Sequence, residues 1–177
     1  METFAFTLVL LEGLDDAKVD ALFEAGCDDA SFGCVDGVCF GDFDREAETL
    51  EDAIASAMAA VESVPGLTVV RVEPDDLVTM SEIAQRLGRT RESVRLLIAG
   101  ERGPGMFPPP VSHLRTHNRL WRWNEVAGWA RDAGIAGPGV SVEGASLIAA
   151  VNAALQMRTV ASPAAKAARA MVGSLRG

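Results

Sequence analysis

The chain has 177 residues, of which 49% are hydrophobic and 23% are charged. These proportions are close to those of soluble globular proteins, so intrinsic disorder and a fibrous class are excluded. A chain of this length accommodates one or two folded domains. No apolar run approaches the roughly 18 to 20 residues that span a bilayer, and Glu2 replaces the basic start of a secretory signal. We therefore expect a cytoplasmic protein with no membrane partner.

The net charge of −9 is distributed unevenly along the chain. Residues 1–76 contain 19 acidic and 3 basic side chains, whereas residues 77–133 contain 5 acidic side chains and 9 arginines. Residues 134–177 contain one acidic and four basic side chains. We expect an acidic domain, a basic domain, and a linker with C-terminal helices over these three ranges. One basic segment on an acidic chain is a hint of nucleic-acid binding, although charge says nothing about fold.

Hydrophobic patterning predicts alternating strands and helices in residues 1–76. The predicted elements are a strand over 4–11, a helix over 15–25, strands over 30–35 and 38–43, a helix from 49 to 63, and a strand over 67–72. The first helix is expected to bury Val19, Leu22 and Phe23, and Asp36-Gly37 favours a tight hairpin turn. This β-α-β-β-α-β order is typical of the ferredoxin-like fold, so the predicted class is α+β.

Two groups of residues in this acidic domain carry candidate chemistry. Cys27, Cys34 and Cys39 are an odd number without Cys-x-x-Cys spacing, which favours reduced thiols over disulfides or zinc. The acidic residues between 28 and 48 form either a solvated surface, a divalent-cation site, or a phosphate mimic for a basic protein partner. Their spacing does not match a calcium loop. We therefore expect no metal and no cofactor.

Two short helices are predicted at the start of residues 77–133. Thr79-Met-Ser-Glu82 has the capping-box pattern that begins a helix, and Gly88 ends that helix. Thr90 then caps a second helix over 91–99, in which Val94, Leu97 and Ile98 share one side. Two short helices joined by a tight turn that contains glycine indicate a helix-turn-helix.

Further motifs follow this helix pair, namely Phe107-Pro-Pro-Pro-Val and then Trp121-Arg-Trp-Asn-Glu-Val-Ala-Gly-Trp129. Together, residues 77–133 resemble the excisionase-like branch of the winged-helix superfamily, which also contains the mercury-resistance-type regulators. The resemblance implies a recognition helix in the major groove of DNA and a β-wing on the flanking backbone. The implied wing is a hairpin of residues 111–115 and 119–123. One departure from the family is the longer linker of residues 100–106.

The candidate DNA contacts are arginines, hydroxyls and other polar residues of the recognition helix, the linker and the wing. Arginine pairs bidentately with guanine and with phosphate, and a helix N-terminus binds phosphate. The candidates are Arg89, Thr90, Arg91, Ser93, Arg95, Arg102, Arg115, His117, Asn118, Arg119 and Arg122. Arg91 either contacts a base or lies across the module toward Glu125. The three tryptophans are interpreted as core residues rather than platforms for base stacking.

A Gly/Pro-rich break over residues 134–139 precedes two predicted C-terminal helices. The first extends from Ser141 to Arg158, and the second begins at Ser162-Pro163. These helices either pack on the acidic domain or form a dimer contact. A homodimer is the usual way to contact two half-sites, so we favour it.

These features favour a transcriptional regulator that binds double-stranded DNA and is not an enzyme, because no nucleophile, base and orienting group occur together. Two alternatives remain. One is an antitoxin or phosphate-mimicking protein that binds a basic partner protein through its acidic domain. The other is an excisionase-like architectural factor that bends DNA. Sequence alone does not reveal the operator, an effector, or repression as against activation.

Overall fold

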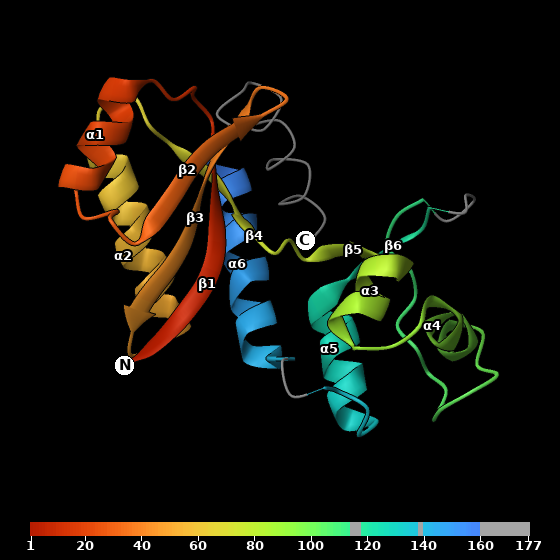
Figure 1. Cartoon of the computed structure of the whole chain (residues 1–177). Helices are drawn as coiled ribbons and strands as arrows, with labels where there is room; N and C mark the ends of the chain where they lie inside the picture. Colours follow the sequence, from red (N-terminus) through yellow and green to blue (C-terminus); the bar gives the residue numbers. More distant parts are fainter. Residues whose placement is uncertain (114–117, 138–139, 160–177) are drawn as a thin grey trace, which may run out of the picture. The chain divides into compact units, whose positions relative to one another are not determined.

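The computed structural model describes residues 1–113, 118–137 and 140–159. The chain forms two compact units: Met1–Glu73 with the residues from Ala150 onward, and Pro74–Ala149. Both units mix helices and strands, with a four-strand sheet in the first, a two-strand sheet in the second, and six helices in the described residues (Figure 1). The α+β class is therefore confirmed. The second predicted C-terminal helix lies outside the described residues.

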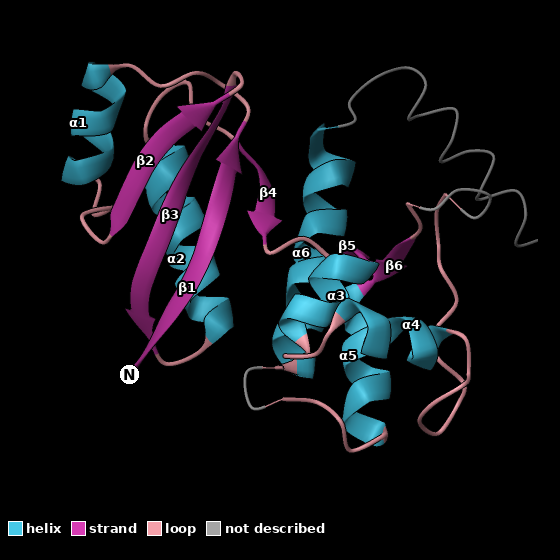
Figure 2. Ribbon diagram, turned by 45° about the vertical axis from the view of Figure 1, so that its right-hand side comes forward, coloured by secondary structure: helices cyan, strands magenta, loops and turns pink. Residues whose placement is uncertain are grey.

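The first unit contains the strands and helices that the hydrophobic pattern predicts. They are β1 (Glu2–Leu10), α1 (Asp16–Glu24), β2 (Ala30–Val35), β3 (Val38–Ala47), α2 (Leu50–Ser63) and β4 (Val69–Glu73). The strands form one antiparallel sheet in the order β2-β3-β1-β4, and α2 lies against one face of it (Figure 2). The core lies between α2 and the sheet, where Ile54 and Val61 of the helix are buried with Leu8 and Phe43 of the strands.

The hairpin between β2 and β3 follows from its turn residues. Asp36 and Gly37 have φ values of 51° and 83°, the left-handed backbone that a two-residue hairpin turn requires and that Asp-Gly adopts readily. The turn pairs Val35 with Val38 and fixes the register of the whole hairpin. Farther along, Gly41 lies under the ring of Phe32, and a side chain at this glycine would collide with that ring.

Helix α1 contradicts the prediction that Val19, Leu22 and Phe23 all face inward. Only Leu22 is fully buried, whereas Val19 is 39% exposed and Phe23 is 66% exposed. Three apolar residues within five positions span a wide arc of a helix, and this pattern does not decide which edge of the arc meets the core. The helix is oriented by Leu22, so Phe23, one residue and 100° farther round, is turned toward solvent.

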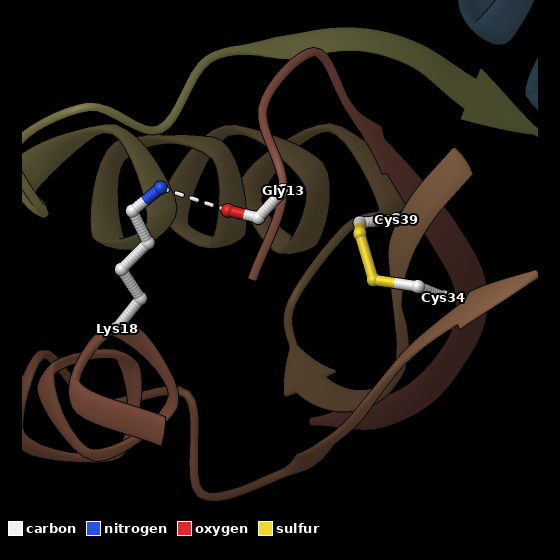
Figure 3. Close-up of a disulfide and its surroundings, with 4 residues drawn as sticks. All are labelled: Gly13, Lys18, Cys34 and Cys39. Atoms are coloured by element: carbon white, nitrogen blue, oxygen red, sulfur yellow. Dashed lines mark hydrogen bonds between the residues drawn. A yellow bond between two sulfur atoms is a disulfide. The ribbon is translucent and has the colours of Figure 1, made fainter. Parts of the chain in front are cut away.

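The cysteines also correct the prediction of three reduced thiols. Cys34 and Cys39 are directly paired residues of β2 and β3, with Cα atoms 4.0 Å apart, and they form a disulfide (Figure 3). Figure 3 also shows the ammonium of Lys18 in α1, which donates a hydrogen bond of 2.8 Å to the carbonyl of Gly13. Cys27 is a free thiol, and burial raises its pKa.

An ion pair holds the loop before β2 against β3 in the first unit. The guanidinium of buried Arg45 donates from Nε and Nη2 to the two carboxylate oxygens of Asp29, at 2.7 and 2.8 Å, and from Nη2 to the carbonyl of Gly26 at 2.7 Å. These hydrogen bonds favour the ionised carboxylate, so they lower the pKa of Asp29. The Arg45 guanidinium also lies 5.2 Å from the centre of the Phe43 ring.

Helix α6 (Val142–Thr159) closes one edge of this sheet with the residues that belong to the first unit. The amide of Asn152, only 5% exposed, accepts from the N–H of Val72 at 2.7 Å and donates to the carbonyl of Val72 at 2.8 Å. Arg158 donates to the carbonyl of Val69 at 2.6 Å, and Glu62 accepts from the Val69 N–H at 2.9 Å. Side chains therefore satisfy the edge of β4, which no strand of the described residues covers.

Replacing Asn152 with leucine is expected to destabilise the first unit by about 1 to 3 kcal/mol, because the backbone donor and acceptor of Val72 lose their partner while buried. Chemical denaturation followed by far-ultraviolet circular dichroism measures the loss. The control is Ala153→Ser at a neighbouring exposed position of α6, which should change stability by less than about 0.5 kcal/mol. Equal stability of Asn152→Leu and the control would contradict this role.

Replacing Asp29 with asparagine is expected to cost about 1.5 to 3 kcal/mol at neutral pH, because Arg45 loses charged hydrogen bonds. The pKa of Asp29 is lowered in the folded state, so its contribution exists above the ordinary carboxyl pKa of about 4 and is lost as pH falls below that value. Unfolding measured from pH 7 to pH 2 should therefore show a smaller difference between wild type and variant at low pH. Asp28→Asn, an exposed neighbour, should show neither effect; a constant difference across this range would refute the assignment.

Candidate nucleic-acid interface

The second unit contains a helix pair that follows a short strand. It contains β5 (Leu77–Thr79), α3 (Met80–Arg86), α4 (Arg91–Ile98), β6 (Leu120–Arg122) and α5 (Trp123–Asp132). The predicted capping box is confirmed, since the Glu82 N–H donates to the Thr79 hydroxyl and Glu82 Oε2 accepts from the Thr79 N–H. Gly88, with φ of 61°, ends α3, and the Arg89 N–H donates to the Ala84 carbonyl.

Helix α4 presents one face to the core and the other to solvent. The Thr90 hydroxyl accepts from the Ser93 N–H at 3.1 Å and so caps the helix, as predicted. Val94 and Leu97 are buried, whereas Arg91 and Arg95 are exposed. The predicted helix over 91–99 matches within one residue. Its exposed face begins at its N-terminal end, where unpaired N–H groups favour an anion.

The arginines predicted to contact DNA differ in whether an acidic side chain pairs with them. Arg95 is held by Glu92 at 3.0 Å and by Glu101 at 3.6 Å. Arg122 is held by Asp76 at 3.0 Å. Arg89 is half-buried, and its buried Nε has no partner among the described residues. Those that are exposed and lack an ion pair within the described ranges are Arg91, Arg102 and Arg119.

The predicted wing is described only at its base. The Val111 N–H donates to the Leu120 carbonyl at 2.8 Å, and the Leu120 N–H donates to the Ser112 carbonyl at 3.2 Å. Strand β6 then pairs with β5. Arg115 and His117 lie outside the described residues, whereas the carbonyl of Asn118 accepts a hydrogen bond from Nδ1 of His113 at 3.1 Å. Trp123 begins α5 and does not extend the wing strand, which corrects the predicted end of the hairpin.

The three tryptophans contribute to the core, as predicted. Trp121 and Trp123 are buried, and Trp129 packs against the same cluster. The indole N–H of Trp129 donates to the carbonyl of Gly105 at 2.9 Å, and its ring lies 4.8 Å from that of Phe107. These contacts attach the long linker to α5. The tryptophans are therefore structural supports for the residues around them.

The residue that sequence reasoning missed is Asp76, the last residue of the predicted acidic domain. Its carboxylate is 5% exposed and accepts from the Asn124 N–H at 2.9 Å and from Arg122 at 3.0 Å. Its carbonyl accepts from the Trp123 N–H at 2.6 Å. Because α5 has no side-chain cap of its own at Arg122, Asp76 caps this helix from a distant part of the sequence.

Other classes of site find little support in the described parts of the chain. No group of three His, Cys, Asp or Glu side chains there could hold a metal ion. Among the same residues, every helix is too short or too polar to cross a membrane. Comparison with protein families, with curated proteins and with solved structures gives no match to this chain.

Replacing Asp76 with alanine is expected to destabilise the second unit by about 1 to 3 kcal/mol, because a helix cap and a buried acceptor are lost together. All three tryptophans of the chain lie in this unit, so tryptophan fluorescence during denaturation measures its stability separately. The matched control is Arg122→Ala. Its side chain is 51% exposed, so losing its ion pair should cost no more than about 1 kcal/mol. An equal cost for both variants would show that the cap is not the main interaction.

Proposed function

We propose that this protein is a transcriptional regulator that binds double-stranded DNA through the second unit, with α4 in the major groove. The observation that carries the proposal is the helix pair α3 and α4, joined by the Gly88 turn, with Arg91 exposed at the start of the second helix. The chemistry is recognition and not catalysis. Arginine at this position reaches base edges or phosphates, depending on the depth of the helix in the groove.

The finer fold assignments belong to the same proposal. The first unit is taken as ferredoxin-like because its elements follow the order β-α-β-β-α-β and its strands the order β2-β3-β1-β4. The second unit is taken as a winged helix-turn-helix because the pairing of residues 111–112 with Leu120 fits the base of a wing. A homodimer on two half-sites is the arrangement that we expect on DNA.

The contact residues are refined by the ion pairs of the second unit. Arg91, Arg102 and Arg119 are the strongest candidates because no carboxylate in the described ranges neutralises them. Arg95 and Arg122 remain candidates, but each has to leave an acidic partner to reach DNA. Thr90 and Ser93 already form the helix cap, so they contribute the position of the helix as well as polar groups.

The test is electrophoretic retardation of a DNA fragment from upstream of the protein's own coding sequence, followed by selection from a random DNA library. Replacing Arg91 and Arg102 together with alanine should weaken binding at least about tenfold, and it should reduce the dependence of log K on log salt by about 2, since each lost phosphate contact reduces it by about 1. Arg131→Ala is the control for an arginine elsewhere on the unit, because Arg131 is paired with Asp132 and Glu143.

Failure of the intact protein to retard any selected DNA would overturn the proposal. An equal loss of binding per arginine removed, in the Arg91 and Arg102 double variant and in Arg131→Ala, would overturn the placement of the interface, because binding would then follow net charge alone. Retardation accompanied by strong bending in a circular-permutation assay would favour an architectural factor over a regulator.

A further inference from the structure

The two edges of the four-strand sheet differ in a way that DNA binding does not explain. The edge at β4 is satisfied by Asn152, Glu62 and Arg158. The edge at β2 has no such cover, because no hydrogen bond from another described residue reaches the outer side of residues 31–35. Ser31, Cys34 and Val35 are exposed.

The alternation of an antiparallel pair identifies which backbone groups of β2 are free. Val35 and Val38 flank a two-residue turn, so they form a hydrogen-bonded pair. Cys34 and Cys39, the next pair along the hairpin, therefore form a non-hydrogen-bonded pair. Their Cα separation of 4.0 Å agrees with this, because the Cα atoms of such pairs lie closer together. The N–H and C=O groups of Phe32 and Cys34 consequently point away from β3, and only another extended chain has the spacing to pair with both residues.

Strand β2 also lacks the features that usually protect an edge. Its sequence, Ala-Ser-Phe-Gly-Cys-Val, contains no charged residue and no proline, whereas natural edges are commonly blocked by lysine, proline or a bulge. The disulfide to β3 fixes the strand in register at the free backbone groups of Cys34. The edge is therefore held ready for pairing, while the opposite edge is closed.

The charge of the first unit indicates which kind of chain pairs with the β2 edge. The two segments of the first unit, Met1–Glu73 and Ala150–Gly177, together carry 17 acidic and 7 basic side chains, so a second copy of this unit would be repelled and a basic chain attracted. We propose that the outer edge of β2 binds an extended segment of a basic partner protein, which adds a fifth strand to the sheet. This is recognition by strand addition. Backbone hydrogen bonds give the affinity, and the acidic surface selects a partner of positive charge.

The test uses the full chain and, as a probe, a peptide of about nine residues that alternates lysine and valine, matched to ordinary strand length. A peptide that alternates glutamate and valine is the control. Nuclear magnetic resonance should show that the lysine peptide slows amide hydrogen exchange at Phe32 and Cys34, which exchange freely without it, and leaves Gly33 unchanged. Binding of both peptides alike, or of neither, would overturn the proposal.

A pair of variants isolates the contribution of the outward-facing N–H of Cys34. Cys34→Pro with Cys39→Ala removes the disulfide and the outward N–H, whereas Cys34→Ala with Cys39→Ala removes only the disulfide. Proline is tolerated where an edge N–H faces solvent, so both variants should fold. If the proline variant does not fold, the hydrogen-exchange measurement on the unaltered chain tests the proposal by itself. The alanine pair should bind the lysine peptide at least about tenfold more tightly than the proline pair, and equal binding would overturn the proposal.

Two further outcomes are informative. A dimer in sedimentation, with Phe32 and Cys34 protected in the absence of peptide, would show that a second copy occupies the edge, and this would overturn the basic partner. DNA retardation should be the same for both cysteine variants, because the second unit is unchanged. Loss of peptide binding and loss of DNA binding are thus measured separately.

Discussion

The second unit depends on one buried carboxylate. Asp76 accepts hydrogen bonds from the first N–H groups of α5 and lies directly before β5 in the sequence. It therefore fixes the residue where β6 ends and α5 begins, and with it the pairing of β5 with β6. Helix α3 begins directly after β5 at Met80, and its start is fixed by its own capping box. The position of α4 is set through this chain of short connections and through the core beneath it. A buried anion at a helix N-terminus is favourable because the helix supplies the compensating donors.

Acidic partners determine which arginines of this unit are available for the proposed contacts with DNA. Asp76 and the carboxylates around Arg95 hold two of the predicted contacts, and their release would cost part of the binding energy. Arg91 has no such cost among the described residues. Charge balance alone, with 9 arginines in residues 77–133, overstates the basic surface for this reason. The same reasoning applies in the first unit, where the Arg45 guanidinium donates to Asp29, Gly26 and Ser56.

Local signals in the sequence were sufficient for much of the fold. The caps at Thr79 and Thr90, the Asp36-Gly37 turn and the core tryptophans each depend on residues within a few positions of one another. What could not be predicted depends on distant pairs, such as Asp76 with Asn124 and Asn152 with Val72. The orientation of Phe23 is set by packing and not by periodicity. The disulfide was predictable in principle, because the Asp-Gly turn places Cys34 opposite Cys39.

The two edges of the four-strand sheet differ because the segment that covers the β4 edge comes late in the sequence. Residues 74–149 form the second unit and lie between β4 and the segment that closes the edge of β4. A fragment that ends after residue 76 therefore lacks Asn152 and Arg158 and leaves Val72 without its side-chain partner. Such a fragment would present two open edges, whereas the described residues of the whole chain leave only the β2 edge open. Partner binding measured on the isolated acidic segment would then mix an artificial edge with the natural one, and only the whole chain separates the two.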